Sequence, residues 1–165
     1  MGHLQFHPAK LIANRTVYSR LLSDLPQHAL LRISLATNLI LFSFMLVFFN
    51  IGFKRDDTAV IMLLANGSLG GSPDEHLVYI HYLFGLILKP LYTLAPSISW
   101  FTWACLTLLF FSFTTLLWSF LQLCAKRVIV FIYLAFFAFY GLANFLILLD
   151  FTQISFAIGA AGLSL

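Results

Sequence analysis

The carboxylates of this 165-residue chain are unevenly placed, and four of the six lie between positions 56 and 75: Asp56, Asp57, Asp74 and Glu75. Asp56 and Asp57 directly follow an apolar run. Adjacent carboxylates can hold a divalent cation such as Mg²⁺ or Mn²⁺ through oxygen ligands, or one can act as a general base on an incoming hydroxyl. A structural role is equally open for one of the pair, because Asp is a favoured helix N-cap and an apolar helix is expected over 58–67.

The second acidic pair, Asp74 and Glu75, lies in the sequence "SPDE". Ser72 as N-cap, Pro73 at the first helical position and Glu75 at the third predict the start of a helix. This capping box does not require Asp74, which could instead face the same water-filled space as Asp56 and Asp57. The preceding "NGSLGGS" predicts a flexible turn that lets two short helices fold back on each other.

Basic side chains accompany these acids. Lys54, Arg55 and Lys89 could extend to lipid headgroups, or together they could hold a phosphate, where charge pairing is strong. His76 and His81 are five residues apart, about 140° around a helix, so one ligand could not easily reach both. We therefore take His76 as the candidate for the site and expect His81 to be a partnered residue at the membrane interface.

The composition indicates what kind of fold positions these residues. The chain is 61% apolar and 9% charged, which is typical of an integral membrane protein and far from a soluble domain. The nine Lys and Arg are spread along the chain without a groove-reading motif, so the sequence predicts no nucleic-acid partner. The partner it predicts is the lipid bilayer. Cys105 and Cys124 lie in or beside apolar runs and are expected to be packing residues.

The apolar runs predict an all-α membrane protein with three full transmembrane helices and an incomplete fourth. The full spans are expected at 34–53, 98–123 and 128–149, and the partial one at 151–165. Residues 1–33 have basic residues and apolar positions at helical spacing, so we expect an amphipathic helix on the cytoplasmic surface. The transmembrane domain then covers 34–165, and residues 54–97 form a loop of two juxtamembrane helices.

The ambiguous element is the predicted helix over 76–96, which is apolar enough to span but carries its polar residues on one face. If it lies on the surface, the cytoplasmic side receives six Lys and Arg and the outer side three; if it spans, the two sides receive four each. The positive-inside rule favours the first arrangement. We therefore expect a cytoplasmic N-terminus, with the acidic loop outside.

Part of the chain resembles a known family. The stretch "RDDTAVIMLLANGSLGGSPDEHLVYIHYLFGLILKPLYTLAPSISWFTW", followed by "LDFTQISFAIGAAGLSL", is similar to the N-terminal part of GT-C membrane glycosyltransferases, in particular to a bacterial group that acts on envelope polysaccharides. The shared features are an Asp pair after the first span, a Gly-x-Pro turn, the segment "LYTLAPSISW" and the segment "FTQISFA". The GT-C class has more spans than this chain provides.

This resemblance implies an activity. In the GT-C class the acidic residue after the first span is the catalytic base or is associated with a metal, and that role falls here on Asp56 or Asp57, with Asp74 next. The donor is a polyprenyl-phosphate-linked sugar, and the acceptor is an envelope glycan at the outer leaflet of the bacterial cytoplasmic membrane. The expected substrate-binding residues are Lys54, Arg55, Glu75, His76 and Lys89.

A second function stays open from sequence. The chain could be a non-catalytic membrane subunit of an envelope polysaccharide assembly complex, with further membrane subunits as partners. Replacing Asp56 and Asp57 by Asn would distinguish the two, since a transferase would lose sugar transfer whereas a scaffold would keep its complex.

Overall fold

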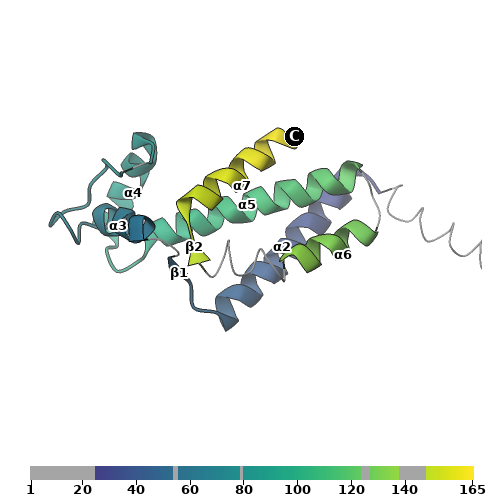
Figure 1. Ribbon diagram of the computed structural model, residues 1–165, viewed down its shortest axis with the longest axis horizontal. Coiled ribbons are helices and arrows are strands. Elements are labelled where there is room, and N and C mark those ends of the chain that lie inside the picture. The colour runs from purple at the N-terminus through teal and green to yellow at the C-terminus, as the bar shows by residue number, and fades with distance from the viewer. Residues whose placement is uncertain (1–24, 54–55, 79, 124–126, 138–147) are drawn as a thin grey trace, which may run out of the picture.

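The computed structural model describes residues 25–53, 56–78, 80–123, 127–137 and 148–165. Within these ranges the regular elements are helices apart from two strands of two residues each, joined by turns and irregular segments (Figure 1). The elements in chain order are α2 (Gln27–Phe48), β1 (Gly52–Phe53), α3 (Asp56–Ala65), α4 (Tyr82–Leu94), α5 (Trp100–Leu123), α6 (Arg127–Phe136), β2 (Leu148–Leu149) and α7 (Phe151–Leu163).

Helix α5 is the central element, and α2, α6 and α7 pack along it (Figure 1). Phe42 of α2 contacts Phe110 of α5 at a centroid distance of 5.4 Å, and one groove is lined by both Leu46 and Trp103, so α2 runs antiparallel to α5. Helix α7 runs parallel to α5, since the Ser164 hydroxyl just after α7 donates to Ser119 near the end of α5, at 3.2 Å.

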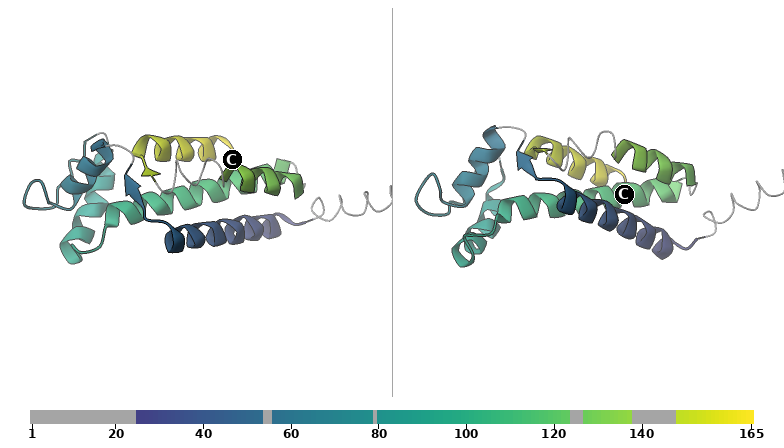
Figure 2. Two further views of the ribbon diagram at one scale, coloured as in Figure 1. Left: turned by 60° about the horizontal axis from the view of Figure 1, so that its bottom comes forward. Right: turned by 90° about the horizontal axis from the view of Figure 1, so that it is seen from below.

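Helices α3 and α4 lie together at the end of the molecule where α5 begins, as both views in Figure 2 show. The first turn of a helix leaves backbone N–H groups without partners, and here the Phe101 N–H donates to the hydroxyl of Tyr92, at 2.9 Å. The Trp100 indole donates to the Ala95 carbonyl at 3.0 Å. These two hydrogen bonds hold α4 against the start of α5.

The two strands join the end of α2 to the start of α7. Gly52 and Phe53 pair in parallel with Leu148 and Leu149. Asp150 follows directly, is buried, and caps α7 by accepting the Thr152 N–H at 2.9 Å. The pairing brings two segments together that are far apart in sequence, at the same end of the molecule as α3.

Two of the described helices are long and apolar enough to cross a membrane: α2, with 22 residues, and α5, with 24. At 1.5 Å per residue, α2 is about 33 Å long, close to the hydrocarbon thickness of a bilayer. Its outward face is apolar, with 69% of Ile40 and 75% of Val47 exposed. In a bilayer, that face would contact lipid.

The expected count of three full spans is not supported. The span expected at 128–149 is represented by α6, which has ten residues, and by the β2 pair at its end; residues 138–147 lie outside the described part. Leu148 and Leu149 are extended because they pair with β1. The partial fourth element, expected at 151–165, agrees with α7.

Other boundaries also differ from the sequence prediction. The first span was expected at 34–53, but α2 covers Gln27–Phe48, beginning just after Pro26 and giving way to the extended β1 segment. The amphipathic helix expected over 1–33 falls mostly outside the described residues, and positions 27–33 belong to α2. The short helix expected over 58–67 is present as α3, which begins and ends two residues earlier, at Asp56 and Ala65.

The helix expected over 76–96 is shorter than predicted. Helix α4 covers Tyr82–Leu94, and the imidazole of His81 caps it by accepting the Leu83 N–H at 3.2 Å. Residues 72–78 are irregular, so the capping box predicted from Ser72, Pro73 and Glu75 does not form. The competing interactions of Asp74 and Glu75, given below, account for this difference.

Candidate functional site

The acidic segment after α3 is held by a tight turn. Gly67 has a φ of +81°, and a Cβ there would come within 2.5 Å of the Ser72 backbone, so a side chain would not fit. The Asp74 N–H then donates to the carbonyl of Leu64 at 3.3 Å. These contacts fix Asp74 at the C-terminal end of α3.

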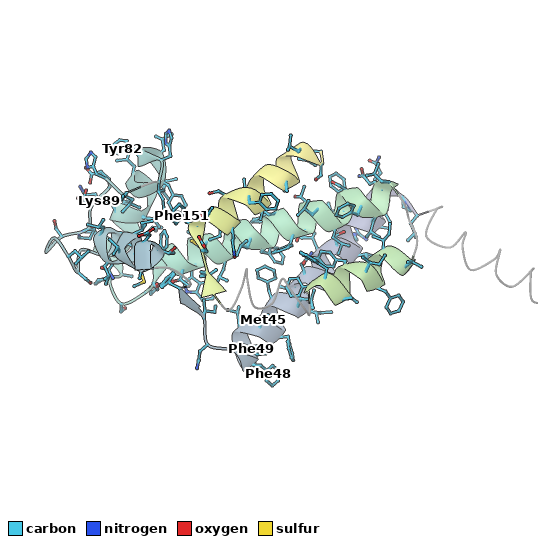
Figure 3. All side chains as sticks on the ribbon, viewed as in Figure 1. Met45, Phe48, Phe49, Tyr82, Lys89 and Phe151 are labelled. Carbon is cyan, nitrogen blue, oxygen red and sulfur yellow. The ribbon has the colours of Figure 1, made fainter. Side chains whose placement is uncertain are left out.

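Glu75 packs against α4 through its backbone. A Cβ placed on Gly85 would lie 2.0 Å from the Glu75 carbonyl oxygen, so the close approach of the two segments depends on glycine at 85. One helical turn further along α4, the Lys89 ammonium forms an ion pair and hydrogen bond with the Glu75 carboxylate. Figure 3 shows Lys89 on α4, at the end of the molecule formed by α3 and α4.

Asp74 and His76 form a second pair beside the first. One oxygen of the Asp74 carboxylate, Oδ1, accepts the His76 backbone N–H at 2.9 Å and lies 3.2 Å from His76 Nδ1. An ionised carboxylate can only accept hydrogen bonds, so Nδ1 carries the proton and donates it. The His76 ring also packs against Tyr82, at a centroid distance of 5.1 Å.

These contacts shift three ionisation equilibria. The backbone and ring N–H groups of His76 hold the pKa of Asp74 below its ordinary value. The hydrogen bond from Lys89 lowers the pKa of Glu75, and the same bond raises the pKa of Lys89. At neutral pH the cluster therefore contains two carboxylates and one ammonium beside the His76 ring.

Asp74, Glu75 and His76 place ligand atoms within 4.8 Å of one another, a spacing at which side chains can share one metal ion. The Glu75 carboxylate is neutralised by Lys89, and Asp74 Oδ1 accepts the N–H groups of His76. A divalent cation would have to displace a positive charge from Glu75 and a donor from Asp74. The residues as arranged do not fit a bound Mg²⁺ or Mn²⁺.

The other predicted carboxylates lie apart from this cluster. Asp56 and Asp57 form the first turn of α3, and Asp57 is exposed. Asp74 contacts Leu64, seven residues along α3 from Asp57, which corresponds to about 10 Å along the axis. The metal site predicted at Asp56 and Asp57 stays a prediction: the Asp56 side chain lies outside what the structure describes, as do Lys54 and Arg55.

An apolar groove adjoins the cluster. It has a volume of about 210 Å³ and lies between α5, α7 and the start of α4, with His81 on its lining. The other lining residues are Ile80, Phe84, Phe101, Cys105, Leu108, Phe151, Ile154, Ser155 and Ile158. The cluster residues do not line the groove, but both lie near the N-terminus of α4, where His81 lines the groove and its neighbour Tyr82 contacts His76.

Sequence reasoning missed Gly85, on which the position of Glu75 depends. Its signal was weak, because one glycine in the apolar helix "YLFGLILK" is compatible with many roles. The expectation that His81 is a partnered residue agrees with its hydrogen bond to the Leu83 N–H. The structure thus brings together Asp74, Glu75, His76 and Lys89, and leaves Asp57 separate.

Known proteins add no further information on the site. The chain matches no family model, no curated protein and no solved structure.

Proposed function

We propose that this chain is a multi-pass protein of the bacterial cytoplasmic membrane and that it is a glycosyltransferase or the N-terminal portion of one. In this proposal it transfers a sugar from a polyprenyl-phosphate donor to an envelope glycan at the outer leaflet. The resemblance to GT-C enzymes suggests the reaction, and the two long apolar helices α2 and α5 are consistent with membrane insertion.

The observation that most favours this proposal is the charged cluster next to an apolar groove. Asp74, Glu75 and His76 lie between α3 and α4, Lys89 lies on α4, and the groove between α5 and α7 is lined by His81 at the N-terminus of α4. A lipid-linked sugar has the same two chemical parts, an ionic and hydroxylated head and a hydrocarbon tail. A surface that offers charges at one end and apolar walls at the other suits such a molecule.

The chemistry of the proposed transfer follows from these parts. An acceptor hydroxyl attacks C1 of the sugar, the bond from C1 to the phosphate oxygen breaks, and polyprenyl phosphate leaves with the bonding electrons. Cationic side chains stabilise the charge on the leaving phosphate, a role for Lys89 and for the predicted Lys54 and Arg55. The carboxylates Asp56, Asp57 and Asp74 are the candidates for accepting the hydroxyl proton or for positioning its acceptor.

The test is sugar transfer by the full chain in liposomes, with undecaprenyl-phosphate-linked hexoses as donors and extracted envelope glycan as acceptor. We expect a double D56N and D57N variant, and a separate D74N variant, each to lose at least about tenfold in rate, while inserting as the wild type does. The matched control is D24N, since Asp24 precedes the first apolar run, on the side expected to be cytoplasmic. Wild-type transfer by all these variants would exclude these carboxylates from the reaction, and absence of transfer by the wild type would contradict the proposed function.

A further inference from the structure

We propose that the proton acceptor of the site is Nε2 of His76 and that Asp74 is the residue that positions its ring. This inference rests on the proposed function, because it names the group that takes the proton from the acceptor hydroxyl. It assigns His76 a role in the transfer step itself, and Asp74 acts only through the ring of His76.

The geometry of the pair supports this assignment. Asp74 Oδ1 accepts two N–H groups of His76, one from the backbone at 2.9 Å and one from ring Nδ1 at 3.2 Å. With the proton on Nδ1, the lone pair of the neutral ring is on Nε2, at the far side from Asp74. The ring packs against Tyr82 and is 73% exposed, so Nε2 is open to a bound hydroxyl.

The other groups around the ring leave His76 as the open base. Among the described segments, Asp74 accepts hydrogen bonds from His76, Glu75 interacts with it electrostatically, and Tyr82 packs against its ring. Glu75 is neutralised by Lys89, and Gly85 holds its backbone against α4. Asp74 Oδ1 accepts both N–H groups of His76. The lowered pKa values of Asp74 and Glu75 make both carboxylates weaker proton acceptors than ordinary ones, which favours the imidazole as the base.

The step balances without a further reactant. The acceptor oxygen forms a bond to C1 of the sugar as the bond from C1 to the phosphate oxygen breaks. The hydroxyl proton moves to His76 Nε2, and the negative charge of Asp74 stabilises the resulting imidazolium through Nδ1–H. Polyprenyl phosphate leaves with the electron pair, and the imidazolium later returns its proton to water.

Two measurements test the inference. The first is kcat and KM of sugar transfer in liposomes for the wild type, H76Q, D74N and the control H28Q, in which the substituted histidine lies at the start of α2. We expect H76Q to lose about 100-fold or more in rate and H28Q to match the wild type. D74N should lower kcat by about tenfold and leave KM unchanged, because a neutral Asn stabilises the imidazolium formed in the step less than Asp74 does.

The second measurement needs no transfer activity. Diethyl pyrocarbonate acylates neutral imidazole, and peptide mass spectrometry separates the five histidines of the chain. At a fixed neutral pH the rate of acylation of His76 should fall in D74N, because Nδ1–H loses its anionic acceptor and Nε2 becomes a weaker nucleophile, while the rate for His28 stays unchanged. Asn retains an oxygen that can accept the His76 backbone N–H, so this substitution tests the charge with little effect on the turn.

The outcomes distinguish the two proposals. Transfer by H76Q within twofold of the wild type, or a D74N kcat equal to that of the wild type, would overturn the inference and leave the transferase in place. An unchanged acylation rate of His76 in D74N would overturn the inference even if no donor is used. A lower acylation rate in D74N without any transfer by the wild type would support the Asp74–His76 pair and overturn the proposed function.

Discussion

At the scale of single residues, Gly85 gives a sharp prediction. A Cβ there would lie 2.0 Å from the Glu75 carbonyl oxygen, so G85A must force the acidic segment away from α4. We expect a loss of about 1–3 kcal/mol in the free energy of unfolding, measured by denaturation in detergent micelles with tryptophan fluorescence. Disulfide trapping between cysteines at Glu75 and Lys89 should also fall in the G85A background.

Gly159 in α7 is the matched control for this substitution. A Cβ at 159 meets no atom within 4 Å, so G159A adds the same methyl group without a clash. Ala is favoured over Gly in a helix interior by about 0.5–1 kcal/mol, which predicts equal or slightly higher stability. Equal effects of G85A and G159A would show that Glu75 does not pack against α4 as described.

The Glu75–Lys89 pair predicts a pH-dependent stability. The pKa of Glu75 is lowered, so its contribution is present above the ordinary value of 4.5 and is lost as the pH falls through the lower folded value. The pKa of Lys89 is raised, so its contribution is present below 10.5 and is lost as the pH rises through the higher folded value. The pair therefore stabilises the segment between these limits.

Substituting Lys89 tests the predicted direction of this pH dependence of stability. Lys89→Met should lower the thermal unfolding midpoint at neutral pH, because the Glu75 carboxylate loses its partner. The difference from the wild type should shrink once the pH falls well below 4.5, where Glu75 is protonated in both proteins. A difference that stays constant across this range would mean that Lys89 acts through packing of its alkyl chain rather than through the ion pair.

The residue types of the cluster could be predicted, but not its pairings. Asp74, Glu75, His76 and Lys89 were all candidates, from their positions in the sequence and from the resemblance to GT-C enzymes. The sequence "SPDE" matches a helix start, yet here the Asp74 carboxylate accepts the His76 N–H and the Glu75 backbone packs against Gly85. Local propensity favoured a helix, and contacts between segments overrode it. Such contacts have no signature in a single sequence.

At the scale of elements, a buried polar pair joins α2 to α6. The Tyr133 hydroxyl donates to Asn38 Oδ1, and the Asn38 amide donates to the Ser34 carbonyl at 3.1 Å. Asn38 is fully buried. In apolar surroundings an interhelical hydrogen bond of this kind contributes about 0.6–2 kcal/mol, so this pair fixes how α6 packs against α2.

Tyr133→Phe removes this hydrogen bond while keeping the ring. We expect it to lower the free energy of unfolding in micelles by about 1 kcal/mol, because the Asn38 oxygen stays buried without its donor. The control is Tyr82→Phe, since Tyr82 is 45% exposed and water can replace its hydroxyl contacts. If the two substitutions have equal effects, the Asn38–Tyr133 bond does not stabilise the packing of α6.

Element prediction from sequence succeeded where the hydrophobic run was long and uninterrupted. The run at 98–123 corresponds closely to α5, and α7 agrees with the expected partial span. It failed at 128–149, where Leu148 and Leu149 are as apolar as any helical residue but pair with β1 instead. An apolar composition predicts burial and does not by itself distinguish a helix from a short extended pairing.

At the scale of the whole molecule, the arrangement of α2 and α5 predicts which positions share a side of the membrane. Ser72, on the segment beside α3 and α4, and Gln27, at the start of α2, are both exposed and lie at opposite ends. With Cys105 and Cys124 replaced, an impermeant thiol reagent on intact cells should label a cysteine at 72 and not one at 27. The proposed outer position of the acidic cluster requires this pattern.

Permeabilised cells provide the control, since both cysteines should then react. Labelling of position 27 alone in intact cells would mean that the whole chain is inserted in the opposite direction, with Asp74 and His76 facing the cytoplasm. Labelling of both positions would mean that α2 does not cross the bilayer. Either pattern would contradict transfer at the outer leaflet.

The parallel pairing of Gly52 and Phe53 with Leu148 and Leu149 has a consequence for biosynthesis. The ribosome completes α3, α4, α5 and α6 before the partner of β1 has been made. Contacts between residues so distant in sequence form late, because the intervening chain must first be ordered. Until then the peptide groups of β1 lack their partners, and the nascent protein offers a sheet edge that a chaperone or another chain could pair with.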